Sequence, residues 1–409
     1  MGPGLITGAS DDDPSGIATY SQVGAQFGYA LGWTLLFTYP LMCAIQQISA
    51  EIGRVTGRGL AGNIRRHYPR ALLYGIVGLL VVANVINIGA DLGAMAAALQ
   101  LLVGGPALAY VAAFGIMTIL LETFVRYSRY VSVLKWLTIS LFAYVGTVFI
   151  VHVPWFEVGR NMILLALSFK KDYVVALVAV LGTTISPYLF FWQAEQEVED
   201  EVERPESRPL KIAPLQAPPE LARIRIDTYV GMAVSNAVAL AILVTAGATL
   251  HAHGLTDIET SAQAAQALRP IAGQFAFVVF ALGIIGTGLL TLPVLAGSAA
   301  YALGEAAGWP VGLARLPQKA KAFYAALAAA TGIGMVLNFT PIDPIKALFW
   351  SAVVNGVAAA PVMAVMMLLA SRKDVMGAFV LSKPLKTVGW IATAVMTAAA
   401  IVMFATLRA

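Results

Sequence analysis

The chain has 409 residues, of which 59% are hydrophobic and only 12% are charged, and its formal net charge is +4. Soluble globular domains are about 45–50% apolar and about 25% charged. The composition, with a mean hydropathy of +0.79, therefore excludes an ordinary soluble domain, a nucleic-acid binder and a disordered scaffold. The single cysteine, Cys43, excludes an intrachain disulfide framework. We expect an all-α polytopic membrane protein that lies in a lipid bilayer.

Apolar stretches long enough to cross a membrane recur along the whole chain. A bilayer core about 30 Å thick requires roughly 20 apolar residues per spanning helix. Eleven stretches meet this requirement: 4–27, 31–53, 73–103, 106–122, 131–152, 173–194, 226–250, 270–301, 320–338, 343–371 and 386–406. We expect eleven transmembrane helices, of which the longest are tilted.

Lysine and arginine residues are unevenly divided between the two sides of this arrangement. Most of the 26 follow the even-numbered spans, as Arg54, Arg126 and Arg204 do. Because cytoplasmic loops carry the excess of positive charge, the pattern predicts a cytoplasmic N-terminus, and the odd number of spans places the C-terminus outside. No basic segment precedes the first apolar stretch, so no cleavable signal peptide is expected. We expect an integral protein of the inner cell membrane.

The longest polar stretch is 195–225, where a run of acidic residues is followed by several prolines. This composition predicts a solvated cytoplasmic linker. We expect one transmembrane repeat over 1–152, a second repeat over 173–371 that contains this linker, and a last helix over 386–406.

Two of the predicted spans are interrupted at corresponding places. Span 4–27 contains SDDDPSG at residues 10–16, and span 173–194 contains GTTISPY at residues 182–188. Each proline removes a backbone donor and clashes with the preceding turn, and non-helical backbone is tolerated at membrane depth only inside protein or beside a water-filled cavity. One proline alone often only kinks a membrane helix. Two breaks five spans apart, one of them acidic, favour the ion-binding site of a secondary transporter.

Carboxylates inside the predicted spans are the second indication of function. A charged side chain at the centre of a membrane helix costs about 2.5–3.5 kcal/mol on insertion scales, and Asp13 and Asp91 lie mid-span. Asp13 lies at the first break, where we expect it to bind a cation. Its neighbours Asp11 and Asp12 point in other directions and are expected to line the intracellular vestibule. Asp91 is compatible with a functional carboxylate and with one satisfied by helix packing.

Several segments together resemble the Nramp (natural resistance-associated macrophage protein) family of divalent-metal transporters over nearly the whole chain. GPGLITGASDDDPSG resembles the family's first helix, which carries an Asp-Pro-Gly-Asn motif, and QQISAEIGRVTGRGLAGNIRRHYPR resembles its second helix and the loop that follows. GTTISPYLFFWQ takes the place of the sixth-helix motif Ala-Thr-x-Met-Pro-His, and SRKDVMGAFV resembles the loop after the tenth helix. The resemblance implies the LeuT fold: two inverted five-helix repeats with broken helices 1 and 6, and an eleventh helix.

The resemblance also implies a metal site, at which this chain departs from the family. The metal-binding aspartate is retained as Asp13, whereas Gly16 takes the place of the family's asparagine. Thr183 takes the place of an alanine that donates its carbonyl, and Ser186 that of the methionine. We expect these four residues at the metal. Vestibule or supporting positions are expected at four more residues: Asp12, Gln46, Asp91 and Tyr188.

These departures indicate a particular kind of metal. A thioether suits thiophilic transition metals, whereas carboxylate, carbonyl and water oxygens suit Mg²⁺ and Mn²⁺. Mg²⁺ also keeps several of its waters in most protein sites, and Gly16 makes the site roomier. The pattern therefore resembles the Nramp-related magnesium transporter branch more than the iron and manganese branch. A decayed or repurposed site is the alternative interpretation of the same changes.

Groups that carry protons in the family are reduced here. The acid that follows Asp91 in the family is Ala94, and the two sixth-helix histidines are Tyr188 and Gln193. The four histidines of the chain fall in loops or at span ends. We therefore expect a secondary transporter that moves Mg²⁺ or Mn²⁺ into the cytoplasm by alternating access, with weak or no proton coupling. Its expected partners are the metal and the bilayer; no cofactor, nucleic acid or obligatory protein partner is expected.

Three other functions are compatible with parts of the sequence. A proton-coupled Mn²⁺/Fe²⁺ importer of the ordinary Nramp type stays open because Asp91 is retained. A sodium-coupled carrier of an organic solute needs a free helix N-terminus for a carboxylate, which the acidic segment 10–16 disfavours, and a channel needs a continuous path. No HExxH or GxSxG motif is present and Cys43 has no evident base, so no enzyme activity is expected.

Overall fold

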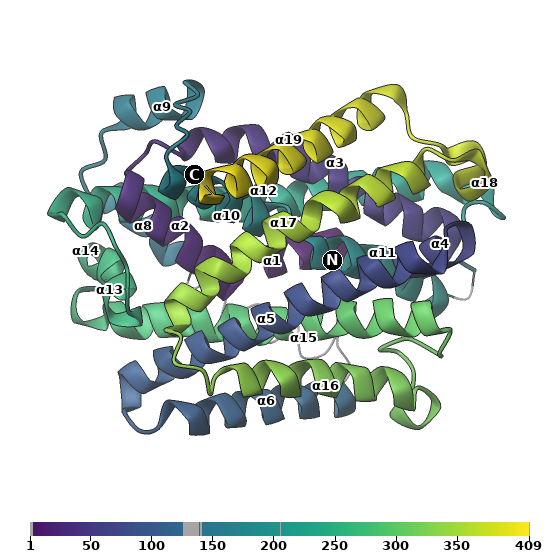
Figure 1. The fold of residues 1–409 in the computed structure, drawn as a ribbon, viewed down its shortest axis with the longest axis horizontal. Helices are drawn as coiled ribbons and strands as arrows, with labels where there is room; N and C mark the ends of the chain where they lie inside the picture. Colours follow the sequence, from purple (N-terminus) through teal and green to yellow (C-terminus); the bar gives the residue numbers. More distant parts are fainter. Residues whose placement is uncertain (1–2, 126–138, 140, 205, 409) are drawn as a thin grey trace.

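The computed structural model describes residues 3–408 except 126–138, 140 and 205 (Figure 1). Within these residues every regular element is a helix and no strand occurs. The all-α fold class predicted from composition and span pattern is confirmed.

The first part of the chain forms seven described α-helices. They are α1 (Pro3–Asp11), α2 (Pro14–Phe27), α3 (Gly32–Thr56), α4 (Leu60–His67), α5 (Arg70–Val103), α6 (Ala107–Phe124) and α8 (Phe142–Ile150). A short helix, α9 (Trp155–Ile163), joins them to the second part. There the long helices are α10 (Lys171–Thr184), α11 (Pro187–Glu203), α12 (Ala217–Thr249), α15 (Ala276–Ala307), α16 (Lys321–Leu337), α17 (Pro344–Ala370) and α19 (Lys383–Arg408). Short helices in the connections are α13 (Ser261–Ala265), α14 (Arg269–Ala272) and α18 (Lys373–Met376).

Seven helical stretches of the described residues are by themselves long and apolar enough to cross a membrane: Arg70–Val103, Ala107–Phe124, Lys171–Glu203, Pro214–His253, Ser261–Ala307, Pro344–Ala370 and Lys383–Arg408. They correspond to seven of the eleven predicted spans. Of the other four, 4–27 is α1 and α2, divided by three aspartates, and 31–53 is α3, which carries several polar residues. Span 320–338 is the shorter apolar helix α16. Span 131–152 lies partly outside the described residues, as do the basic residues Arg126, Arg129 and Lys135.

The long helices form two packing groups. Helices α5, α6, α15 and α16 pack against one another and run side by side along one edge of the ribbon (Figure 1). Helix α12 packs against α1, α2 and α3, and α3 also packs against α11. Helix α17 contacts α5, α10 and α19. The four helices that meet at the two predicted breaks, α1, α2, α10 and α11, therefore pack with the second group, and α17 connects that group to α5.

The polar stretch 195–225 is an exposed linker only in its middle part, whereas its composition predicts one throughout. Helix α11 continues to Glu203 and α12 begins at Ala217, so only the middle of the stretch is irregular. Glu195 and Glu197 are buried. Composition does not reveal that acidic residues of this stretch form ion pairs with arginines of other helices.

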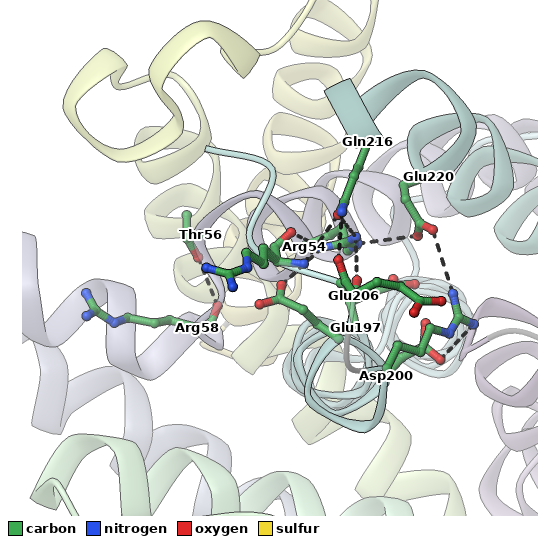
Figure 2. A network of polar contacts seen from close by, with 12 residues as sticks. Arg54, Thr56, Arg58, Glu197, Asp200, Glu206, Gln216 and Glu220 are labelled. Carbon is green, nitrogen blue, oxygen red and sulfur yellow. Dashed lines mark hydrogen bonds and ion pairs between the residues drawn. The ribbon is translucent and has the colours of Figure 1, made fainter. Parts of the chain in front are cut away.

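Those arginines form the polar network drawn in Figure 2. Arg54, on α3, is 1% exposed and forms ion pairs with Glu201 (3.1 Å) and Glu220 (3.3 Å). It also donates to the carbonyl of Arg208 at 2.7 Å. Arg223, on α12, pairs with Glu197 on α11. A buried charge is tolerated only when it is paired and hydrogen-bonded, and this network joins α3, α11 and α12 through several such pairs.

Candidate metal site

Asp13 occupies the gap between α1 and α2 and is the N-cap of α2. Its backbone is extended (φ −73°, ψ 170°), and Pro14 begins the helix, a position at which a missing N–H is harmless. Asp13 Oδ1 accepts hydrogen bonds from the Gly16 N–H (2.6 Å) and the Ser15 hydroxyl (2.7 Å). An aspartate at this position both satisfies free helix N–H groups and is favoured by the helix dipole. The first break therefore fixes one carboxylate oxygen firmly to α2.

The second oxygen of Asp13 faces other helices. Asn87 Nδ2, on α5, lies 3.1 Å from Asp13 Oδ2, and the Tyr188 hydroxyl, on α11, lies 3.4 Å from it. Asn87 Nδ2 also lies 3.4 Å from Asp91 Oδ2, so the amide is placed between the two carboxylates. The predicted positions Asp91 and Tyr188 are thus brought to Asp13, one through Asn87 and the other directly.

The second break lies between α10 and α11. Ile185 and Ser186 interrupt the helix, and Pro187 begins α11. The Ser186 hydroxyl donates to the carbonyls of Gly182 (2.7 Å) and Thr183 (3.1 Å), at the end of α10. The hydroxyl proton is shared between two carbonyl groups that the break has left without a helical partner. The lone pairs of the Ser186 oxygen are therefore free to coordinate a cation.

Gly16 and Thr183 bring the two breaks together. A Cβ built on Gly16 would lie 3.1 Å from Thr183 Oγ1 and 3.4 Å from Asp13 Oδ1. Thr183 Oγ1 is buried and has no hydrogen-bond partner. A buried polar atom without a partner is rare and requires an explanation. Here the hydroxyl and the Asp13 carboxylate both face the space that Gly16 leaves without a side chain.

Among the residues that the structure describes, no positively charged side chain forms an ion pair with the aspartates of this region. None of the ion pairs formed by the described residues includes Asp11, Asp12, Asp13 or Asp91. All four are buried. Burial of an unpaired carboxylate is strongly unfavourable unless a proton or a metal ion accompanies it. The arrangement therefore has the charge of a cation site.

Asp11 and Asp12 are directed away from the second break. The Ser235 hydroxyl, on α12, lies 2.5 Å from Asp11 Oδ2 and 3.2 Å from Asp12 Oδ1. Asp12 also lines a cavity of about 110 Å³ between α1, α8 and α12. Asp11 and Asp12 therefore meet at one hydroxyl, contrary to the expectation that all three carboxylates point in different directions, and only Asp13 is separate from the other two. Among the described residues no three His, Cys, Asp or Glu side chains are close enough to hold a metal ion together, so neutral oxygens would have to complete a metal site at Asp13.

Gln46 forms no hydrogen bond with Asp13. It is buried on α3, and its Oε1 has no hydrogen-bond partner. Sequence reasoning missed Asn87, whose amide contacts Asp13 directly. A signal existed: Asn87 precedes Asp91 by four residues, so both lie on one face of the third span, where a buried amide needs polar partners. The histidines are placed as predicted, since His67 ends α4 and His251 lies in a short turn after α12.

The two approaches to the breaks differ. A cavity of about 360 Å³ lies between α2, α10 and α17 and reaches Ala18, two residues beyond Gly16. Gln22, Asp172 and Asp257 are among its lining residues. On the opposite side α1 packs closely on α12: a Cβ on Gly8 would overlap the backbone of Gly231. Neither this cavity nor the one beside Asp12 is lined by Asp13, Gly16, Thr183 or Ser186.

Comparison with known proteins places this geometry in context. A sequence model of the family described as natural resistance-associated macrophage protein-like (Nramp) matches residues 4–406. The fold is similar to that of the manganese transporter of Eremococcus coleocola, solved in complex with an aromatic bis-isothiourea substituted compound (TM-score 0.75, 18% identity, 99% of this chain and 86% of that chain). It is also similar to Mhp1, a nucleobase-cation-symport-1 family transporter in a closed conformation with bromovinylhydantoin bound (TM-score 0.57, 12% identity, 100% of this chain and 93% of that chain). These likenesses confirm the predicted LeuT fold.

Proposed function

Since the chain belongs to the Nramp family, we propose that it is a secondary transporter that binds a divalent metal cation between its two helix breaks. One observation carries the assignment: the buried carboxylate of Asp13, which forms no ion pair with any described residue, and the unpartnered hydroxyl of Thr183 both face the space that Gly16 leaves without a side chain. We assign Asp13, Thr183 and Ser186 as ligands, and Gly16 as the position that leaves them room. Asp12, Gln46, Asp91 and Tyr188 line the route or support the ligands.

We further propose that the physiological metal is Mg²⁺ or Mn²⁺, as in the magnesium-transporting branch that the sequence resembles. The groups at the breaks are carboxylate, hydroxyl, amide and carbonyl, which suit hard cations. Ser186 supplies an oxygen where the family's motif has a thioether. The Gly16 position leaves space for retained water, and Mg²⁺ dehydrates reluctantly. No cofactor forms part of this proposal, because the metal is the cargo.

The proposed direction of transport is into the cytoplasm, with the N-terminus inside and the C-terminus outside an inner cell membrane. We also propose that the repeats 1–152 and 173–371 alternate in opening the site, with 386–406 as an additional helix. An inside-negative potential of 100 mV is worth about 4.6 kcal/mol for two positive charges, roughly 2.3 for each. That corresponds to more than about a thousandfold concentration ratio at about 1.4 kcal/mol per decade, so uptake needs no coupled proton.

The test is metal influx into proteoliposomes with a clamped potassium-diffusion potential and a pH-sensitive dye inside. Mn²⁺ and Mg²⁺ influx should increase with inside-negative voltage and cause little acidification. If neither Mn²⁺ nor Mg²⁺ enters the proteoliposomes, the transport assignment is rejected. Metal-dependent acidification that is lost in Asp13→Ala would reject uncoupled transport while keeping the metal site.

A proton-coupled Mn²⁺ importer is the second candidate, and one observation favours it. Asn87 lies between Asp13 and Asp91, so a metal at Asp13 and a proton at Asp91 would act on the same amide. The dye measurement separates the two candidates. Acidification that scales with the metal dose would decide for the coupled importer.

A further inference from the structure

Two carboxyl groups, one buried and one partly exposed, lie close together away from the breaks. Glu195 lies on α11 and Glu305 lies near the end of α15. The two carboxyl groups lie side by side, because both reach the space next to Gly59. A Cβ built on Gly59 would overlap Glu195 Oε1 and lie 2.7 Å from Glu305 Oε2. The carboxyl pair therefore occupies the space that only a glycine at this position leaves free.

The two groups have different surroundings. Glu305 Oε1 accepts the Gly59 N–H at 2.9 Å and Glu305 Oε2 accepts the Gly62 N–H at 2.7 Å, at the N-terminus of the eight-residue helix α4. Both these bonds and the helix dipole favour a charged carboxylate. Glu195 is 2% exposed, and no donor reaches its Oε1. Nothing in its surroundings stabilises a second negative charge.

Two carboxylates in contact cannot both be ionised, because like charges at this distance hold one proton between them. Two acceptors also attract each other only when one of them carries a proton. Glu305 is therefore the carboxylate, and Glu195 is the acid that donates to it. Placed side by side in this way, the two groups require one bound proton between them.

The pair lies where the two packing groups of helices meet. The network of Arg54 and Arg223 joins α11 to α3 and α12 (Figure 2), whereas α15 packs on α5 and α16. Secondary transporters of this architecture change access by rocking one such group against another. A bond between α11 and α15 therefore resists a movement that would open the cytoplasmic side.

We propose that Glu195 and Glu305 form a proton-binding site, here called the carboxyl latch, which holds α11 against α15 while protonated and releases it when the shared proton leaves. Its effect on metal release rests on the proposed transport function, but the proton-controlled contact does not. The latch lies apart from Asp13 and Asp91, so its proton regulates access and is not a cargo.

Other charged groups face the latch from each element around it. Glu199, on α11, accepts from the Tyr301 hydroxyl of α15 at 2.7 Å and favours retention of the proton by its negative charge. Arg58 favours ionisation of Glu305, and Arg65, on α4, donates to the Glu305 carbonyl at 3.2 Å. With one proton released on opening, the ratio of open to closed molecules rises with pH, by at most about tenfold per pH unit.

The test is a distance measurement by pulsed electron spin resonance on the metal-free protein in lipid nanodiscs. Spin labels are attached to Val202→Cys and Ala307→Cys in a Cys43→Ala background; both labelled positions are exposed and lie near the ends of α11 and α15. Between pH 6 and pH 8.5 a population with a longer distance should grow. An unchanged distance distribution would overturn the proposal.

Two variants move the latch in opposite directions. Glu195→Gln donates permanently to Glu305, so the short distance should persist at both pH values. Gly59→Ala displaces Glu195, so the long distance should be present even at pH 6. The control Glu203→Gln removes an exposed acid at the end of the same helix and should behave as the parent. A pH response in Glu195→Gln equal to that of the parent, or a parent-like Gly59→Ala, would contradict the latch; failure of metal influx would leave this test unaffected.

Discussion

At both breaks the following helix begins with a proline, but the residue before the proline has a different role at each break. Asp13 turns its carboxylate forward onto the N–H of Gly16 and so caps α2. Ser186 turns its hydroxyl backward onto the carbonyls of α10, and no side chain caps α11. The first break holds a fixed negative charge, and the second presents neutral oxygens. We infer that the first provides most of the binding energy for a cation and the second determines which cation is preferred.

The largest expected effect comes from removing the charge of the first break. One charge about 4 Å from a unit charge is worth about 4 kcal/mol at an effective dielectric constant of 20, and more for a divalent ion. Asp13→Asn should therefore reduce Mn²⁺ affinity by at least about a hundredfold and abolish influx. The matched change in the second break, Ser186→Ala, should reduce affinity by less than about tenfold. Titration calorimetry measures both, and equal losses would remove the distinction between the breaks.

A soft donor in the second break should change selectivity. Ser186→Met combined with Gly16→Asn should raise the affinity for Cd²⁺ relative to Mg²⁺ by about tenfold or more, since a thioether favours thiophilic metals. The asparagine must fit beside Thr183 Oγ1, which lies 3.1 Å from the Cβ position, so Thr183→Ala should be added where the double variant expresses poorly. An unchanged Cd²⁺/Mg²⁺ ratio in competition binding would exclude ligand softness as the cause of selectivity.

Thr183 and its neighbour Thr184 provide a sharper comparison within the second break. Thr183 Oγ1 has no partner, whereas Thr184 Oγ1 lies 3.2 Å from the Tyr20 hydroxyl. Thr183→Val should raise the melting temperature of the metal-free protein, because an unsatisfied buried group costs about 1–3 kcal/mol, and should weaken metal binding several-fold. Thr184→Val should lower the melting temperature and leave metal binding nearly unchanged. The two substitutions should change the melting temperature in opposite directions. Changes in the same direction would mean that Thr183 is not a metal ligand.

The smallest effect is expected at Asp91. In Asp91→Asn the side-chain oxygen still accepts from Asn87, so the arrangement around Asp13 is retained. Without proton coupling, the rate of Mn²⁺ influx and its pH dependence should change by less than about threefold. Loss of acidification together with loss of influx in this variant would instead favour the coupled importer.

The sequence predicted the breaks correctly because proline chemistry is local. Pro14 and Pro187 each disfavour a continuous helix, although Pro40, Pro293 and Pro361 lie inside helices of this structure. The additional indication at the first break was Asp13, which is costly inside a membrane unless it binds something. The approach of Thr183 to Gly16 needed the family's motif, since the two residues lie far apart in the chain. Asn87 was missed because an amide in an apolar helix gives a weaker signal than a carboxylate.

The prediction of a solvated linker failed at the two ends of 195–225 for a related reason. A run of acids shows its charge in the sequence but not its counter-charges, and Arg54 and Arg223 reach Glu201 and Glu197 only after folding. Local composition shows the acidic residue of each ion pair but not the arginine that pairs with it. Whether a charged segment is solvated or paired depends on contacts between distant helices, which composition does not contain.

The central claim is that one divalent cation binds at the junction of the two breaks, on Asp13. Anomalous X-ray diffraction at the manganese absorption edge, from crystals soaked in Mn²⁺, tests it most directly. We expect one strong anomalous peak beside Asp13 and Thr183 that disappears in Asp13→Asn crystals soaked in the same way. A peak at Asp11 and Asp12 against α12, or a peak that persists without the Asp13 carboxylate, would contradict the account.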